Sequence, residues 1–118
     1  MAEINPDALK LFSFLLFSKL EGAVTSAMVH LGDHLGLYKA LARADSPLTT
    51  AQLAHSTGLH ERWVREWCYN QASAKLISFS SAPSTPPTVT DDTFFLSPEQ
   101  RAVDRKSTRL NSSHLGIS

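Results

Sequence analysis

The sequence predicts a mainly α-helical chain that ends in a small pair of β-strands, and three observations support this fold class. The first part of the chain carries apolar residues at helical spacing. Two shorter helical segments then meet at Gly58, and a β-prone stretch follows at residues 76–79. The order helix, turn, helix, strand, loop, strand is that of a winged helix-turn-helix. We therefore predict N-terminal helices in residues 1–45, and a winged helix-turn-helix with a two-stranded wing in residues 46–104.

The N-terminal segment has more apolar surface than a single buried face requires. A helix is expected to start at Asn5-Pro6, because asparagine caps helices and proline suits the first helical position. The apolar residues that follow cover more than one side of this helix, so they need neighbours on both sides. A chain of 118 residues has little to supply on the second side. We therefore expect an intermolecular or interdomain contact there.

A second helical pattern starts after Gly22 and continues to Leu35. Gly32 and Gly36 are four residues apart and share one face, where they would let another helix approach closely. Alternatively, Gly36 ends the helix and residues 37–41 form a further turn or two. Both interpretations remain open from the sequence.

Residues 49–73 contain the start and stop signals of two helices. Thr49 and Gln52 have the spacing of a capping box, and Gly58 is a natural left-handed end. Trp63 and Trp67 follow helical spacing in the second helix of this pair.

Residues 76–96 are expected to form the wing. The first strand is predicted at residues 76–79, and a Ser- and Pro-rich loop follows at residues 80–88. The return strand is predicted at Val89-Thr90 and Phe94-Phe95-Leu96. Another helix is then expected to begin with Ser97 as its cap and Pro98 in its first turn.

The charge distribution argues against nucleic acid as the partner. Residues 1–104 hold eight basic and eleven acidic residues, a net charge of −3. On the second helix of the pair, Arg62 and Arg65 are offset by two glutamates, and residues 80–88 contain no Lys or Arg. Neutralisation of phosphates supplies most of the non-specific affinity for DNA. A winged-helix transcription regulator that binds DNA is therefore the alternative function and not the first one.

No group of catalytic, cofactor-binding or metal-ligating residues stands out. The five glycines form neither a G-x-G-x-x-G loop nor a P-loop. Cys68 has no activating base that the sequence reveals, and we expect it to pack as a small core residue. His30, Asp33 and His34 have a spacing that can hold a metal, but no further ligand is fixed nearby, so we expect them to line a helix face. We predict no catalytic, cofactor or metal site in this chain.

Nothing in the sequence predicts secretion or membrane insertion. The N-terminus lacks the positive region of a signal peptide. The apolar run Leu11–Phe17 is interrupted by Ser13 and is far shorter than the ~20 residues that span a bilayer. The single cysteine cannot form an internal disulfide. We expect a cytoplasmic protein that does not bind membranes.

Three motifs resemble the N-terminal domain of a group of class I S-adenosylmethionine-dependent methyltransferases. Residues 32–41 are similar to the group's GD-x-LGLY-x-L signature. In the group a winged helix follows this signature, and residues 48–67 resemble its first part. Residues 95–103 resemble the connection into the next helix. The chain departs from the group at Ala74-Lys75-Leu76, where relatives tend to have a glycine and an aromatic residue.

This resemblance implies a role for this chain and an activity for the full-length protein to which it belongs. In that group, the N-terminal domain helps form dimers and covers the substrate side of the active site, and the methyl donor binds a Rossmann-like domain further along the chain. The chain is thus expected to be the dimerisation and substrate-lid domain of a truncated methyltransferase that acts on a small molecule. S-adenosylmethionine is expected only for the full-length parent, and the expected partners are a second copy and the missing catalytic domain. The candidate dimer or interdomain contacts are Leu11, Phe12, Leu15, Leu16, Val24, Met28 and Leu31.

Two further predictions complete this interpretation. A plain interaction module that pairs through Leu11–Leu20 is a third functional possibility.

Residues 105–118 change composition abruptly, with three basic and no acidic residues. They resemble a translated adapter or vector read-through, and we predict that the genuine reading frame ends near Asp104 and that this tail is foreign and disordered.

Overall fold

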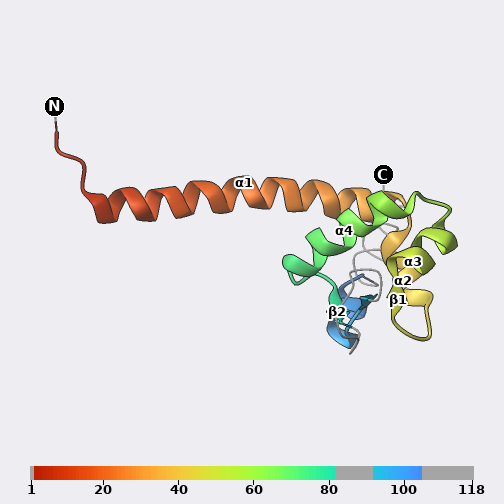
Figure 1. The fold of residues 1–118 in the computed structure, drawn as a ribbon. Coiled ribbons are helices and arrows are strands. Elements are labelled where there is room, and N and C mark those ends of the chain that lie inside the picture. Colours follow the sequence, from red (N-terminus) through yellow and green to blue (C-terminus); the bar gives the residue numbers. More distant parts are fainter. Residues whose placement is uncertain (1, 82–91, 105–118) are drawn as a thin grey trace, which may run out of the picture.

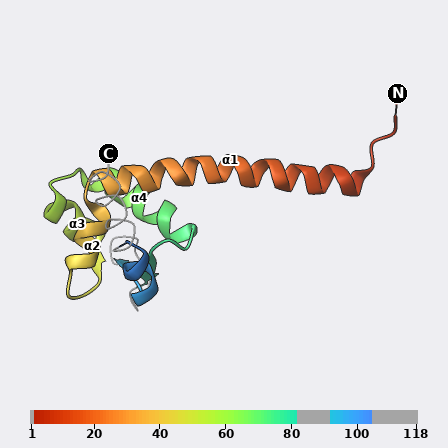
Figure 2. The same cartoon turned by 180° about the vertical axis from the view of Figure 1, so that it is seen from behind.

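The computed structural model describes residues 2–81 and 92–104 and consists of a long helix joined at one end to a winged helix. Figure 1 shows helix α1 (Pro6–His34) extending away from the other elements, and the reverse view in Figure 2 shows the same separation. At about 1.5 Å per residue, its 29 residues span about 43 Å. Only its C-terminal end contacts the winged helix.

Helix α1 begins as the sequence predicts. The Asn5 side chain accepts hydrogen bonds from the backbone of Asp7 and Ala8, and Pro6 opens the helix. The break expected after Gly22 is absent, so one continuous helix replaces the two that were predicted. A glycine inside a helix costs only about 1 kcal/mol relative to alanine, which the remaining residues of a long helix readily offset.

Gly36 ends α1 and leads into the short helix α2 (Leu37–Arg43). Its φ of 78° lies in the left-handed region, which a residue without a Cβ adopts at no steric cost. The interpretation in which Gly36 ends the helix is therefore confirmed. The close helix approach that was predicted for Gly32 and Gly36 together is present at Gly32 alone, because a Cβ at Gly36 would meet nothing within 4 Å.

Helices α3 (Thr50–Thr57) and α4 (Glu61–Ser73) form the helix-turn-helix. The capping box is present, since the Thr49 side chain accepts from the backbone of Gln52 and the Gln52 side chain accepts from the backbone of Thr49. Gly58 ends α3 with a φ of 71°. His60 caps α4 by accepting from the backbone of Arg62.

The wing contains one more strand than the two that were predicted. Strand β2 (Ser78–Ser80) and strand β3 (Thr93–Phe95) pair antiparallel, with Phe79 opposite Phe94. Strand β1 (Leu48–Thr49), which precedes α3, adds to the other edge of β3 and gives the order β1-β3-β2. The predicted strand at Val89-Thr90 lies outside the described residues.

Residues 98–104 form a further helix whose start follows the predicted signal. The Ser97 hydroxyl accepts from the backbone of Gln100, and the Gln100 side chain accepts from the backbone of Ser97. The foreign origin of residues 105–118 and the division at residue 45 stay predictions, and the tail lies outside the described residues.

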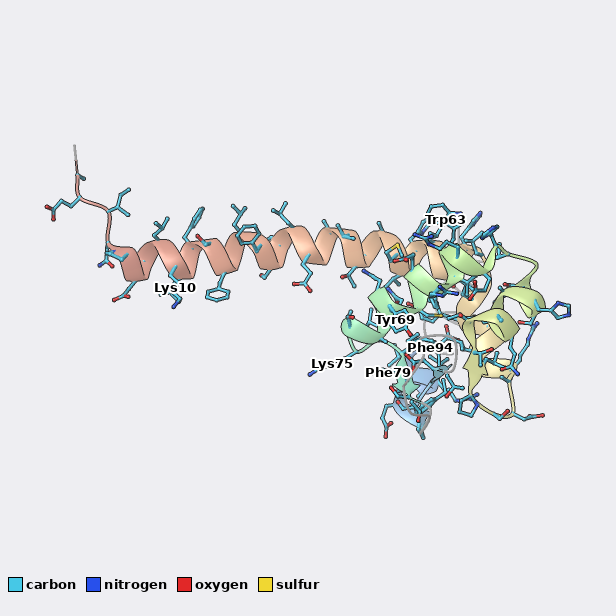
Figure 3. All side chains as sticks on the ribbon, in the orientation of Figure 1. Lys10, Trp63, Tyr69, Lys75, Phe79 and Phe94 are labelled. Carbon is cyan, nitrogen blue, oxygen red and sulfur yellow. The ribbon has the colours of Figure 1, made fainter. Side chains whose placement is uncertain are left out.

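The buried core lies entirely in the winged helix and α2. It is built from side chains of α2, α3, α4 and the sheet, with Trp67 and Phe94 as its largest members. In Figure 3, Tyr69 and Phe94 lie between α4 and the sheet, and their rings meet edge to face at 5.3 Å. In α1, only Gly32 is buried.

Candidate functional site

The predicted contact residues all lie on α1, and nearly all of them face solvent. Six of the seven have exposed fractions between 43% and 71%, whereas Met28 is partly buried against the core. Figure 3 shows the side chains along most of α1 pointing outward without neighbours. Phe14, Phe17 and Leu20 lie in the segment Leu11–Leu20 that the sequence also suggested for pairing, and they are equally exposed, as is Leu9.

The apolar residues of α1 surround the helix instead of forming one stripe. Leu15 and Leu16 are adjacent and therefore point about 100° apart, Phe12 lies one turn away on the face between them, and Phe14 and Phe17 lie on the other sides of the helix. A helix that is apolar all round is stable in water only when it is enclosed. Contact with one flat partner would leave part of this surface exposed.

Helix α1 also satisfies the length and composition criteria of a membrane-spanning helix. Its mean hydropathy reaches 1.3 over 18 residues, and none of that window is buried. The apolar segment is thus longer than the run Leu11–Phe17 on which the sequence argument relied. One such helix near an N-terminus is weak evidence, because core helices of soluble proteins pass the same test.

A close contact between Gly32 and Trp67 joins α1 to the winged helix. A Cβ at Gly32 would lie 2.3 Å from the Trp67 ring, so the two helices approach more closely than any side chain at residue 32 permits. The Trp67 indole N–H donates to the backbone carbonyl of Met28 at 2.9 Å. The ring of Tyr38, from α2, meets Trp67 edge to face at 5.1 Å. Three helices are therefore fixed around one tryptophan.

The Tyr38 hydroxyl extends this junction by donating to the side-chain oxygen of Gln71, which is fully buried on α4. Burial raises the pKa of Tyr38 to about 12, and the negative charges of Asp104 and Asp33 act in the same direction. Tyr38 therefore remains a neutral hydrogen-bond donor. The sequence placed Trp67 on a helix but gave no sign that Met28 and Gly32 would be its partners.

The outer face of α4 carries arginines that are already paired. Arg65 contacts Glu61 at 2.7 Å and Arg62 contacts Glu66 at 3.8 Å, each one helical turn apart. Hydrogen bonds from Arg65 and from Thr50 lower the pKa of Glu61, so this carboxylate stays charged. The sequence indicated that two glutamates balance the charge of these arginines, and in the structure each arginine contacts one of the two.

The residues considered for chemistry show no catalytic arrangement in the described part of the chain. Cys68 is fully buried, and burial raises the pKa of its thiol to about 12, which keeps it in the unreactive protonated form. The rings of His30 and His34 stack with their centroids 6.3 Å apart. Among the described residues, no three His, Cys, Asp or Glu side chains gather closely enough to hold a metal ion.

The fold and this junction define the chain as a winged-helix domain with a projecting N-terminal helix. Residues 23–103 match the family described as the Rv2258c-like winged HTH domain, and the chain belongs to this family. The match includes the last turns of α1 together with the whole described winged helix. No curated protein sequence matches the chain significantly.

Solved structures share the fold at low sequence identity. Human N-acetylserotonin methyltransferase in complex with SAM is 18% identical, with a TM-score of 0.62 over 83% of this chain and 26% of that one. A LepI variant in complex with SAH and a substrate analogue is 21% identical, with a TM-score of 0.58 over 80% and 24%. Staphylococcus aureus MarR in complex with salicylate and kanamycin is 13% identical, with a TM-score of 0.50 over 94% and 77%. The chain spans about a quarter of the length of the first two proteins.

Proposed function

We propose that this chain is the N-terminal dimerisation and substrate-lid domain of an S-adenosylmethionine-dependent methyltransferase that acts on a small molecule. By itself it neither binds the methyl donor nor catalyses transfer. The observation that carries this proposal is helix α1, which is apolar on all sides and exposed along most of its length. Such a helix needs an enclosing surface that this chain alone does not offer.

The enclosing surface is best supplied from two sources. A second copy can bury one side of α1 through its own α1, and a catalytic domain of the same protein can bury the opposite side. Fully burying a Leu or Phe side chain stabilises by about 1.5–3 kcal/mol, so the eleven large apolar residues exposed on α1 provide ample driving force. The lack of a cofactor or catalytic site and the cytoplasmic location remain predictions within this proposal.

The comparisons support this proposal at the level of the fold. A human methyltransferase with bound SAM is among the proteins that share the fold, and the chain spans 26% of its length. That share is the size expected of a leading domain to which a separate donor-binding domain is joined. The motifs at residues 32–41 and 95–103 point to the same group of enzymes.

The oligomeric state tests the role of α1. We expect light scattering to give a dimer for the unmodified chain, and a monomer for the double variant Phe12→Ser and Leu16→Ser, which removes two apolar residues from adjacent turns of α1. Phe79→Ser is the matched control, because Phe79 is equally exposed but lies on β2 between two serines. A monomer for the unmodified chain at high concentration would contradict the proposal.

The methyltransferase parentage needs a separate test. The nucleotide sequence downstream of codon 104 should encode a strand followed by a Gly-rich loop of the donor-binding type. Calorimetric titration of the isolated chain with S-adenosylmethionine should show no binding. Micromolar affinity for S-adenosylmethionine would refute the proposal that donor binding belongs to a separate domain. An uninterrupted genomic reading frame through residues 105–118 to a stop codon would refute truncation.

A DNA-binding transcription regulator is the alternative, and the MarR structure favours it because the shared fold covers 77% of that protein. Both arginines on the outer face of α4 are paired with glutamates, which reduces the charge available for phosphates. The regulator hypothesis predicts a salt-dependent DNA complex that weakens when Arg62 or Arg65 is changed to alanine. The absence of a gel shift at low salt would dismiss it.

A further inference from the structure

A cavity of about 530 Å³ lies where the last turns of α1 meet α2, the start of the wing and the helix at residues 98–104. This volume is within the range of about 300–1,000 Å³ that small-molecule sites occupy. Its walls are mainly apolar, and they include Val29 from α1, Leu76 and Leu96 beside the wing, and Val103 from the last helix. None of the functions discussed above uses this cavity.

Acidic side chains outnumber basic ones around this cavity. Among the described residues that line it, Asp33, Glu99 and Asp104 are acidic, Lys75 is the one Lys or Arg, and His30 is the one histidine. Figure 3 shows the Lys75 side chain extending away from the winged helix. Within the part of the chain that the structure describes, both ion pairs lie on α4, so none of these three carboxylates is in direct contact with a Lys or Arg side chain.

The carboxylates are close enough to influence one another. Burial raises the pKa of Asp104, and the negative charge of Asp33 raises it further, whereas Lys39 opposes the shift. Asp33 belongs to α1 and Asp104 to the last helix, so residues 71 positions apart in sequence create one negative region beside apolar walls. A positive charge placed between them would relieve their repulsion.

We propose that this cavity binds a small organic cation, namely a protonated amine carried on an aromatic or aliphatic body. The apolar walls would bury the body, and Asp33 and Asp104 would hold the ammonium group. An organic anion fits poorly because it would meet three carboxylates and one lysine. The proposal depends only on the residues around the cavity and holds whether or not the chain belongs to a methyltransferase.

The test is a titration of the full chain with 2-phenylethylamine, followed by two-dimensional amide NMR. We expect saturable shifts at residues of the cavity, and much weaker shifts with the uncharged 2-phenylethanol and the anionic 3-phenylpropionate. Asp33→Asn and Asp104→Asn should each weaken amine binding about fivefold, as expected for the loss of a partly exposed charge contact. Asp45→Asn, which removes an exposed carboxylate outside the cavity, should leave binding unchanged.

Two outcomes would overturn the proposal. Equal binding of the amine and the alcohol would show that the carboxylates do not select the ligand. Unchanged affinity in both aspartate variants, with their spectra still those of the folded protein, would place the amine elsewhere.

Discussion

The winged helix and α1 treat the same types of side chain in opposite ways. In the winged helix, Leu53, Phe94 and Leu96 are almost completely buried. On α1, leucines and phenylalanines of equal size are half to two-thirds exposed. Because the two regions belong to one chain, this difference distinguishes the winged helix, which buries its own core, from α1, whose apolar surface is available to a partner.

The boundary between the two regions is the contact of Gly32 with Trp67. Toward the C-terminus from Gly32, the chain buries most of its large apolar residues against its own elements, with Trp63, Phe79 and Val103 as the most exposed exceptions among the described residues. Toward the N-terminus from Met28, α1 has caps and backbone hydrogen bonds but little tertiary contact. Helices in proteins gain most of their stability from tertiary packing, so α1 should depend on its partner much more than the winged helix does.

The largest expected effect comes from matched truncations in the two regions. Phe94→Ala removes a side chain with 0% exposure and should lower the free energy of unfolding by about 3–5 kcal/mol. Phe14→Ala removes one that is 66% exposed and should change it by less than about 0.5 kcal/mol in the unassociated chain. Urea denaturation monitored by tryptophan fluorescence measures both, and equal losses would contradict the division into two regions.

A smaller effect is expected at the boundary itself. Gly32→Ala places a methyl group 2.3 Å from the Trp67 ring and should destabilise the chain by about 1–3 kcal/mol. Gly22→Ala is the matched control on the same helix, because nothing lies within 4 Å of its added Cβ. That variant should gain up to about 1 kcal/mol of helix stability. Thermal melts followed by circular dichroism distinguish the two, and a stable Gly32 variant would show that the helix contact is adjustable.

The sequence was most informative where structure depends on near neighbours. The capping box at Thr49 and the helix end at Gly58 involve residues no more than a few positions apart, and both were predicted correctly. The helix end at Gly36 was one of two interpretations that the sequence left open. The third strand was missed because residues 48–49 gain their pairing only from residues 93–94. The junction was missed for the same reason, since Trp67 bonds to Met28 over 39 positions.

The candidate site shows a different limit of sequence reasoning. The excess of apolar residues on α1 was evident from composition, and the structure places six of the seven predicted contacts on exposed surface. The identity of the partner is not encoded in this excess, because apolar side chains show only that water must be excluded. The negative cavity involves residues from opposite ends of the described chain, and no local pattern marks it.

The smallest effect concerns two helix ends with the same geometry and different residues. After α3, Gly58 has a φ of 71°, and after α4, Lys75 has a φ of 64°. In both places the next residue donates its backbone N–H to a carbonyl five positions earlier, Leu59 to Ala54 and Leu76 to Gln71. The resemblance had marked residues 74–76 as a departure from a glycine, and the structure shows that the left-handed position falls on Lys75.

Substitutions at Gly58 and Lys75 test whether positive φ has the same steric cost at both helix ends. Lys75→Gly should raise the free energy of unfolding by about 0.5–1 kcal/mol, because glycine adopts positive φ without the steric cost that lysine bears. Gly58→Ala should lower it by about 1 kcal/mol for the converse reason. Both changes fall in the winged helix, so differential scanning calorimetry should detect them at any protein concentration. If Lys75→Gly destabilises the chain instead, the entropy that glycine adds to the unfolded state outweighs the relief of strain, and the two helix ends are not equivalent.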